Sequence, residues 1–509
     1  MQKYFLGGLL TVSVLAISLT SCGGKVSEQA DWRNKEINTS FRNKGIDGYR
    51  FDNSTAEQAE FQNASGVNPV FRKVEFPSAR FQNAMFENPD FTEANLEGAN
   101  FSGADMRGAN FSGANLERAV LYKTVLLNNE SEALARATSF SGASFIDANL
   151  TGVKISEGIN FRSTDLTNAK VMDVDLTGAD FNGAVVQRAD FTSSNLAGAS
   201  FKGAEVSGAN FSKCNLTNAN FIDVDLSNTK FLGSGLQRVD FSGAVFGNAD
   251  FTGADFSLTS FSNADFKKAK IQKAIFSQSS LSDMNFDKMN INGVVFDKGS
   301  VFKGIFEGTK MQDASFYSAD VDKCEFIGSD MKNVVFANAN VKRSMFVKAN
   351  LTRANFTKAY LDRIIFEESN IGNAVFDSTT LRKITFFNSD LQSSRFNAGT
   401  VLEDVDFSGA DLTRAKMDNL QAKNVTQVLY DDKTKFPSGF EPASLNFIYV
   451  GKVVETTKKK KKKEIIDDDD DAPAPPVTTK KKKGAEPPPP PPPPEPERKR
   501  KKKSSSDNN

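Results

Sequence analysis

From Phe161 to Val401, every fifth residue is Phe, Leu, Ile, Val or Met, without an exception in 49 positions. This period fits neither regular element. Fifth residues drift by about 140° around an α-helix and form no apolar face, and they alternate between the two faces of a β-strand. A backbone that bends once per repeat and always turns the same residue inward satisfies the pattern. The sequence therefore predicts a coil whose core is filled by one apolar residue per repeat.

The residues around each apolar centre repeat as well. A small residue lies two positions before the centre, as with Ala179 and Ala199, and the two residues after it are usually polar or Gly. The unit reads A-[ND]-[FL]-[ST]-G, and repetition at a short fixed period indicates a solenoid. From roughly Phe71 to Met417 the chain resembles the pentapeptide repeat family. The resemblance implies an all-β fold, a right-handed quadrilateral β-helix with four pentapeptides per coil and coils stacked about 4.8 Å apart.

The spacing of Phe predicts which walls of the coil are aromatic. Phe recurs every ten residues from Phe181 to Phe241, which places it on two opposite walls with aliphatic residues on the other two. The centres from Phe241 to Phe266 are then all Phe, after which the phase shifts, so the Phe walls and aliphatic walls should exchange there. Each buried Phe contributes about 2–3 kcal/mol. The predicted core ladder includes Phe181, Phe191, Phe201, Phe211, Phe276, Phe286, Phe296 and Phe306.

The first residues have the features of an export signal. Lys3 precedes an apolar stretch that is too short and too close to the terminus for a transmembrane helix. Leu19-Thr20-Ser21-Cys22 resembles the bacterial lipobox, which implies that Cys22 becomes the acylated N-terminus and a membrane anchor. An ordinary signal peptide with a chance Cys is the alternative. By family analogy, Gly23 in place of Asp favours the outer membrane or cell surface of a two-membrane bacterium.

The composition divides the chain into five parts. Residues 122–139 break the repeat and are expected to form an inserted loop or short helix, and single-residue insertions are expected between Ile155 and Phe161 and near Val401. The predicted parts are a lipoprotein signal peptide (1–21), a polar tether (22–40), a pentapeptide repeat β-helix (41–417), a C-terminal cap (418–451) and a disordered Lys/Asp/Pro-rich tail (452–509).

The tail carries 17 basic residues against 11 acidic ones, a net charge of +6. Because the whole chain sums to zero, residues 1–451 carry −6. The tail is expected either to bind a polyanion, such as a cell-surface polymer, nucleic acid or an acidic protein, or to act as a solubilising arm.

The chain has no histidine, which excludes Ser-His-Asp and Cys-His catalysis and every His-ligated metal site. Cys214 and Cys324 lie at the small inward position on opposite walls, too far apart for a disulfide, so they are expected to be buried thiols. The Gly residues follow the repeat and form no phosphate-binding loop. We therefore expect no enzyme activity, no cofactor, no metal and no small-molecule substrate.

One column of charged residues stands out on the surface. Residues that lie two positions after the apolar centres of one wall should stack, one per coil. On one wall these residues are Lys303, Lys323, Arg343, Arg363 and Lys383. Two further cations, Lys342 and Arg382, are adjacent to this column. One interpretation is a solvated face with Asp322 and Asp362 as local partners. The other is a stripe that docks an anionic partner or the tail's own run of Asp467–Asp471.

Two functions are compatible with these features. The first is a lipid-anchored scaffold or interaction protein of the cell envelope, bound to an unknown protein or anionic polymer. The second rests on the resemblance alone, since some pentapeptide repeat proteins mimic DNA and protect topoisomerases. The export signal and the weak net charge of residues 1–451 argue against the second function.

Overall fold

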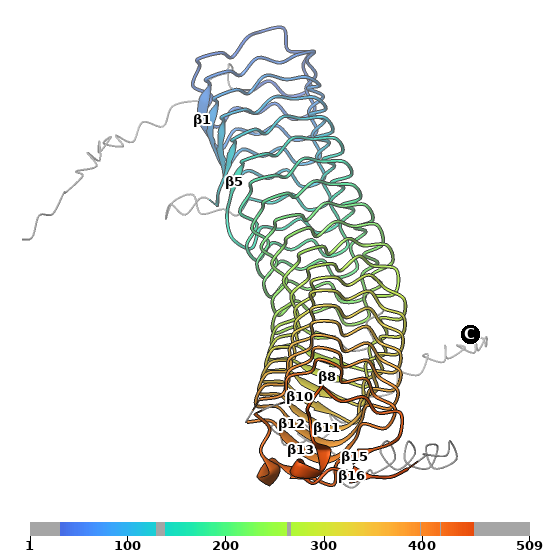
Figure 1. The fold of residues 1–509 in the computed structure, drawn as a ribbon. Coiled ribbons are helices and arrows are strands. Elements are labelled where there is room, and N and C mark those ends of the chain that lie inside the picture. The colour runs from blue at the N-terminus through green and yellow to red at the C-terminus, as the bar shows by residue number, and fades with distance from the viewer. Residues whose placement is uncertain (1–30, 129–137, 262–265, 398, 418, 452–509) are drawn as a thin grey trace, which may run out of the picture. The chain divides into compact units, whose positions relative to one another are not determined.

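A computed structural model describes residues 31–128, 138–261, 266–397, 399–417 and 419–451. All of them belong to the compact unit Met1–Ile466 and contain no α-helix, and those before residue 418 form a stack of four-sided coils (Figure 1). The predicted β-helix is therefore confirmed. The signal peptide, Cys22, the helix expected within residues 129–137 and the C-terminal tail lie outside the described residues.

Each coil pairs with the next at a distance of 20 residues along the chain. Asp180 forms a parallel bridge with Ser200, and the Phe181 N–H donates to the Ser200 carbonyl at 2.8 Å. In return the Ser200 N–H donates to the Ala179 carbonyl at 2.9 Å. Four pentapeptides thus complete one coil, and backbone hydrogen bonds between coils hold the stack together.

The bend that the five-residue period requires lies two residues after each centre. There the backbone enters the left-handed region, with φ of 66° at Gly183 and 58° at Asn168. Gly adopts this region without a steric cost, and Asn tolerates it better than most residues. This explains why Gly and Asn recur at that position, although Lys, Arg, Asp and Ser also occupy it in many coils.

Two parallel sheets follow the walls of the coils. The first has five strands in chain order: β1 (Ser65–Val67), β2 (Met85–Glu87), β3 (Asp105–Arg107), β4 (Val125–Leu126) and β5 (Lys154–Ile155). The second has eleven: β6 (Ser260–Phe261), β7 (Ser280–Ser282), β8 (Ser300–Phe302), β9 (Asp320–Asp322), β10 (Asn340–Lys342), β11 (Tyr360–Ile365), β12 (Thr380–Thr385), β13 (Val401–Asp406), β14 (Val425–Thr426), β15 (Leu429–Tyr430) and β16 (Ile448–Tyr449). Between these sheets the described coils are joined by isolated parallel bridges.

Stacked Phe rings fill the centre of the coil. Phe306, Phe326 and Phe346 lie above one another with ring centroids 4.7 and 4.6 Å apart, whereas Phe316 from the opposite wall meets Phe326 edge to face at 6.1 Å. Offset stacks and edge-to-face pairs are the favourable geometries for aromatic rings. All eight Phe of the predicted ladder have an exposed fraction of 0%.

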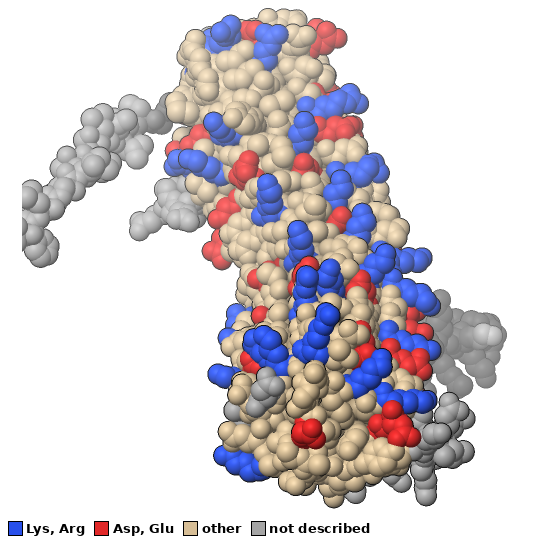
Figure 2. Space-filling view, in the orientation of Figure 1, with Lys and Arg blue, Asp and Glu red and all other residues tan. Residues whose placement is uncertain are grey.

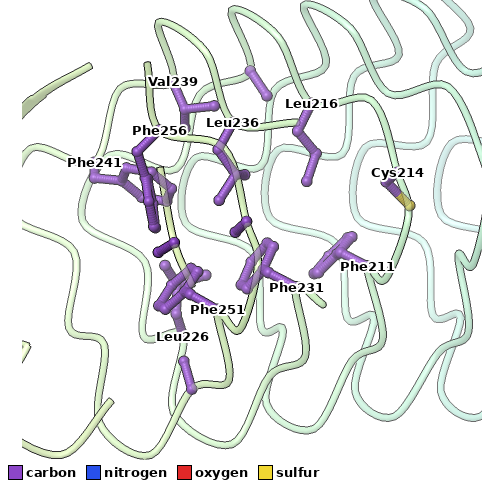
Figure 3. Packing of buried hydrophobic residues seen from close by; sticks show 14 of the residues in the cluster. Phe211, Cys214, Leu216, Leu226, Phe231, Leu236, Val239, Phe241, Phe251 and Phe256 are labelled. Atoms are coloured by element: carbon purple, nitrogen blue, oxygen red, sulfur yellow. The ribbon is translucent and has the colours of Figure 1, made fainter. Parts of the chain in front are cut away.

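The Phe and aliphatic walls exchange near residue 250. Phe211, Phe231 and Phe251 form one stacked column, with centroids 5.1 and 4.8 Å apart (Figure 3). On a neighbouring wall, Phe256 takes the place that Leu236 has one coil earlier. Phe256 then stacks on Phe276 of the following coil. The transition passes through coils in which neighbouring walls both carry Phe.

The largest interruption is shorter than residues 122–139. Residues 122–128 continue the coil, because β4 pairs with β3 in the ordinary register of 20. The partners of the next coil are 29 residues apart, as in Asn110 and Ser139, so nine residues are inserted. Thr138 closes the insertion: its Oγ1 donates to the Leu127 carbonyl, and its N–H donates to Asn128 Oδ1, both at 3.0 Å.

Two single-residue insertions shift the register to 21. The first precedes Asn160, which pairs with Ser139. The second precedes Val401, which pairs with Thr380. Both insertions predicted from the sequence are therefore confirmed. The second moves the inward position from Val401, which is half-buried, to Leu402, which is buried with 0% exposed. The extra residue moves the inward position by one.

The coils begin earlier than expected. Asp31 already pairs with Arg50, and Ile37 is buried with 6% exposed, so residues 31–40 form part of the first coil rather than a tether. The sequence obscures this because Ile37 and Phe41 are four residues apart, and the register there is 19. Residues 41–70, in which the five-residue period is weaker, pair with the following coil in the register of 20, as Gly45 does with Ser65.

The last coil is covered by residues 419–451. This segment contains the short 3-10 helices η2 (Ala422–Asn424) and η3 (Pro442–Leu445) and strands β14–β16. Phe447 stacks over Phe407, the last Phe of its column, at 6.2 Å and an interplanar angle of 9°. Asp431 organises the turn, since its Oδ1 accepts hydrogen bonds from the backbone N–H groups of Gly409, Lys433 and Thr434.

Candidate functional site

The strands β8–β13 form one wall, called here the β8–β13 wall. Figure 2 shows Lys and Arg side chains, with Asp and Glu among them, along the coils of the stack. Parallel pairing in the register of 20 or 21 places equivalent residues of successive coils side by side. As a result, charged residues of this wall form two adjacent columns.

The first column alternates in sign. It consists of the residue that directly follows each inward residue: Phe302, Asp322, Lys342, Asp362, Arg382 and Glu403. Opposite charges placed directly across neighbouring strands attract, whereas like charges repel. This column is therefore internally balanced and needs no external partner.

The second column lies at the corner of the wall and is basic. Lys303, Lys323, Arg343, Arg363 and Lys383 occupy successive coils, each in the left-handed bend of its repeat, and Asp404 ends the column. The two columns together hold seven cations against four carboxylates, a net charge of +3. The column predicted from the sequence is thus present as a stack, but its members differ in exposure.

Arg343 does not belong to an exposed stripe, and it pairs with Asp322, one of the two local partners that the first interpretation of the sequence names. Only 3% of its side chain is exposed. Its guanidinium turns back onto Asp322 of the preceding coil, with Nε 2.9 Å from Oδ1, and the second nitrogen also contacts this carboxylate. The Arg343 N–H donates to the Asp362 carbonyl at 2.9 Å. The charge of Arg343 is neutralised within the wall, which interrupts the corner column at its centre.

Arg382 also forms ion pairs within the β8–β13 wall. It lies 3.5 Å from carboxylate oxygens of both Asp362 and Glu403, and 35% of its side chain is exposed. Its pKa is raised, first by a side-chain hydrogen bond with Tyr360 and then by the charge of Asp362. Asp362 itself is buried, with 6% exposed.

Aromatic rings accompany two of the lysines. The Lys303 Nζ lies 5.2 Å from the centroid of the Phe302 ring, and the Lys342 Nζ lies 6.0 Å from the centroid of the Tyr360 ring. Such contacts orient the cation and are worth about 0.5–1 kcal/mol at exposed sites. Lys342 is half-buried, whereas Lys303 is exposed. The wall therefore presents fixed positive groups near its corner.

The buried thiols have no reactive environment. Cys214 and Cys324 are free, and burial raises the pKa of each thiol to about 12. The Cys214 Sγ donates to the Phe191 carbonyl at 2.9 Å, and the Cys324 Sγ lies 3.4 Å from the Val301 carbonyl. A thiol that stays protonated is a poor nucleophile. Both residues fill the small inward position that Ala occupies in other coils.

Neither a metal-holding cluster nor a membrane-spanning helix is present among the described residues. No group of three or more His, Cys, Asp or Glu in that part of the chain could hold a metal ion. None of its helices has the length and apolar character that crossing a membrane requires.

Models of two families match the chain. A model described as a pentapeptide repeat region matches residues 194–264 and 300–376. A model of pentapeptide repeats in eight copies matches residues 90–122, 159–198, 172–208 and 259–297. No curated protein matches the chain significantly.

Several solved structures of repeat proteins are similar. HetL, a pentapeptide repeat protein involved in heterocyst differentiation regulation from the cyanobacterium Nostoc sp. strain PCC 7120, is 21% identical over 49% of this chain and 92% of its own, with a TM-score of 0.17. QnrB1, a plasmid-mediated fluoroquinolone resistance protein, is 19% identical over 45% and 92%, with a TM-score of 0.20. A pentapeptide repeat protein from the Arabidopsis thaliana thylakoid lumen is 28% identical over 20% and 65%, with a TM-score of 0.12.

Proposed function

This chain belongs to the pentapeptide repeat family, and we propose that it is a non-enzymatic interaction scaffold anchored by lipid in the cell envelope. Pentapeptide repeat proteins are in general structural or interaction proteins rather than enzymes. The observation that carries the proposal is the packing of the interior: stacked Phe rings occupy the centre of the coil, and ionisable side chains are arranged along its walls. Recognition is then a property of the outer surface.

The anchoring part of the proposal rests on the sequence. Leu19-Thr20-Ser21-Cys22 follows an apolar stretch, as in bacterial lipoproteins, and the coils begin at residue 31, only nine residues after Cys22. An acylated Cys22 would hold the first coil close to the membrane surface. The rest of the described coils would extend the binding surface away from the anchor, one coil after another.

Metabolic labelling tests the anchor. Cells expressing the full chain are grown with a palmitate analogue that carries an alkyne, and the chain is then purified and assayed for the label. We expect labelled protein in the membrane fraction, and no label on the Cys22→Ser variant. A matched Cys214→Ala variant should remain labelled, because Cys214 is buried in the coil. An unlabelled wild-type chain in the cytoplasmic fraction would contradict the proposal.

For the partner, we propose an anionic polymer or an acidic protein that docks on the corner column of the β8–β13 wall. Besides Arg343, the column places four cations in left-handed bends of its coils. Lys303 is exposed, and Lys323, Arg363 and Lys383 are half-buried. Cations held on a rigid scaffold attract polyanions, and the attraction weakens with salt because mobile ions screen it. The basic tail, with its net charge of +6, is proposed to add to this attraction.

Binding of poly-L-glutamate tests the corner column. Replacing Lys303, Lys323, Arg363 and Lys383 by Ser in the full chain should weaken binding about tenfold or more at low salt and reduce its salt dependence. Replacing Lys288, Lys298, Lys348 and Lys358 by Ser is the control matched in charge, since these four lysines also occupy left-handed bends but follow the centres of other walls. Equal losses in the two variants would show that only net charge matters and would reject the docking site.

The alternative function is DNA mimicry that protects a topoisomerase. A DNA mimic needs a continuous negative surface, whereas the column Asp322, Lys342, Asp362, Arg382 alternates in sign. This arrangement favours the scaffold. The alternative predicts a cytoplasmic, unlabelled chain that reduces gyrase inhibition by a fluoroquinolone in a supercoiling assay.

A further inference from the structure

A column of largely aliphatic residues runs along the outside of the coil, on the wall that precedes the β8–β13 wall in each coil. Each member directly precedes an inward Phe, and parallel bridges join successive members in the register of 20. All of them are half-buried, and none carries a charge. The members, called here the Val335 column, are Ile275, Val295, Ser315, Val335, Asn355 and Val375.

The surface beside the Val335 column adds an exposed ring and little free charge. Tyr317 lies on this flank, and 41% of it is exposed. The two carboxylates of the flank are engaged within their own wall. Asp297 accepts a hydrogen bond from the Tyr317 N–H at 3.0 Å, and Asp377 accepts one from Arg395 Nε at 2.9 Å. Aliphatic and aromatic groups on a flat wall favour association, because contact removes them from water.

We propose that this wall binds the same wall of a second copy of the chain, with the two coil axes parallel and a two-fold axis between them. Each member of the Val335 column then meets its own counterpart, so that Val295 faces Val295 and Val335 faces Val335. A partner has to present apolar groups at the spacing of the coils, and a second copy does so because its coils repeat in the same way. The same surface serves both sides, as a two-fold interface requires.

The residues on either side of the column fit the parallel orientation. The two-fold axis brings the flank that follows each inward Phe opposite the bend that precedes the column in the second copy. Tyr317 of one copy then lies near Asp313 of the other, to which its hydroxyl can donate a hydrogen bond, and Asp297 lies near Gly293. At none of the six levels of the column do like charges face each other in this arrangement.

An antiparallel pair fits this wall less well. Centred on Val335, it would set Asp297 against Asp377 of the second copy, and like charges across an interface repel. Centred on Ser315, it would set Ile275 against the polar side chain of Asn355. The parallel orientation is also the one that a lipid anchor at the N-terminus of both copies would impose, which is the single point where this inference rests on the proposed function.

The parallel pair leaves the corner column accessible. The corner column lies at the end of the β8–β13 wall that is remote from the Val335 column, because each of its members follows the centre of that wall. Two copies would therefore present two basic columns side by side, both available to a partner.

Cross-linking of introduced cysteines in the purified full chain tests the contact. Facing sheets pack about 10 Å apart, a distance that a short bismaleimide spans. Val335→Cys should therefore give a species of twice the mass of the monomer. Val347→Cys is the matched control and should not cross-link, since Val347 is also a half-buried outward valine but lies on the opposite wall. Equal cross-linking at both positions, or none at position 335, would overturn the proposal.

A mixture of two cysteine variants that carry different tags tests the orientation. In a parallel pair, Val295→Cys and Val375→Cys should each cross-link only to chains of their own kind, because the two levels are four coils apart. An antiparallel pair centred on Val335 would join one variant to the other. Recovery of such a mixed product would contradict the parallel axis.

Sedimentation equilibrium of the full chain in a non-ionic detergent measures the association itself. The contact covers only six coils, so we expect a weak and reversible dimer. Val295→Lys with Val335→Lys should raise the dissociation constant about tenfold or more, since each lysine would face its own counterpart. Ile327→Lys with Val347→Lys, on the opposite wall, is the matched control and should leave the dimer unchanged.

Far-UV circular dichroism and the melting temperature establish that the lysine variants are folded. The coil should tolerate them, because Lys332 and Lys342 already occupy outward positions on other walls. A wild-type chain that stays monomeric, or equal weakening by both pairs of substitutions in folded variants, would contradict the interface. Neither readout depends on acylation of Cys22, so such a result would leave the lipid anchor untouched.

Discussion

The guanidinium of Arg343 lies against the carboxylate of Asp322 in the preceding coil, with Nε 2.9 Å from Oδ1 and 3% of the Arg343 side chain exposed. Asp322 is itself only 15% exposed. A buried pair of this kind adds little net stability relative to well-packed apolar residues, but removing one partner leaves the other charge without compensation. The pair therefore fixes the side chains of two successive coils at the centre of the β8–β13 wall.

Arg343→Met should lower the free energy of unfolding by about 3 kcal/mol, because the Asp322 carboxylate stays buried after its partner is lost. Denaturant unfolding followed by circular dichroism measures this loss. Adding Asp322→Asn to the variant should restore part of the loss. Lys303→Met, at the same bend two coils earlier and exposed, should change stability by less than about 0.5 kcal/mol. Equal effects of the two Met substitutions would contradict the burial of the pair.

Gly304→Ala should lower the free energy of unfolding by about 1–3 kcal/mol through overpacking. An added Cβ would lie 2.7 Å from Phe306 Cε2 and 3.1 Å from Val301 Cγ1. The Phe306 ring has little freedom to move, because it stacks at 5.0 Å and 4.7 Å on the rings of the coils on either side.

Gly45→Ala is the control for the Gly304 prediction. Its Cβ would meet nothing within 4 Å, so the substitution should be neutral or stabilising by up to about 1 kcal/mol, through the reduced freedom of the unfolded chain. Thermal melts of the two variants should shift in opposite directions or differ clearly in size. A Gly304→Ala variant as stable as Gly45→Ala would show that the core at this coil is loosely packed.

The buried thiols should make stability fall at alkaline pH. Burial raises the pKa of Cys214 and Cys324 from 9.0 to about 12 in the folded chain. Between pH 9 and pH 12 the unfolded chain loses thiol protons that the folded chain retains, so rising pH favours unfolding. The expected loss is about 1.4 kcal/mol per thiol for each pH unit in that window, with no thiol contribution below pH 9.

The thiol contribution is isolated by comparing variants, since Lys and Tyr also titrate above pH 9. Cys214→Ala with Cys324→Ala should show a shallower decline of unfolding free energy between pH 9 and pH 10.5 than the wild type does. The folded wild-type chain should also react slowly with a maleimide at pH 8 and rapidly once unfolded. Parallel stability curves for the two proteins would mean that the thiols titrate normally in the folded state.

The five-residue period was sufficient to predict the inward face of most coils. Any residue that follows the period, such as Phe181 or Phe306, is buried because the bend returns once per pentapeptide. The insertion near Val401, which moves the inward position to Leu402, was predicted. The coil that already includes Asp31 was not predicted, because the spacing from Ile37 to Phe41 is one residue short. A single residue changes the register without leaving a distinctive motif.

The column of cations could be predicted from the sequence, but the burial of each cationic side chain could not. A period of 20 correctly places Lys323 and Arg343 in neighbouring coils. The sequence assigns them equivalent positions, whereas the structure buries the Arg343 side chain and leaves Lys323 half-buried. The difference depends on the orientation of a long side chain relative to Asp322. Sequence spacing carries no information about that choice.

The alternation of charge along the β8–β13 wall is visible in the sequence at a period of 20 residues, although not at a period of five. Taking every twentieth residue from Asp322 gives Lys342, Asp362 and Arg382, which alternate in charge. The edge strand β16 had no comparable signal, because the residues after Met417 no longer follow the repeat. Its exposure depends on how the cap folds over Phe407.

Site-specific photocrosslinking in living cells tests most directly whether the function resides on the β8–β13 wall. A photoreactive amino acid replaces Lys323 on this wall, or Lys358 at a bend that follows a different wall of the same coils. The account predicts a discrete adduct from position 323 that is lost when Arg363→Ser and Lys383→Ser are added, and no such adduct from position 358. The same adducts from both positions, or an adduct only from position 358, would contradict it.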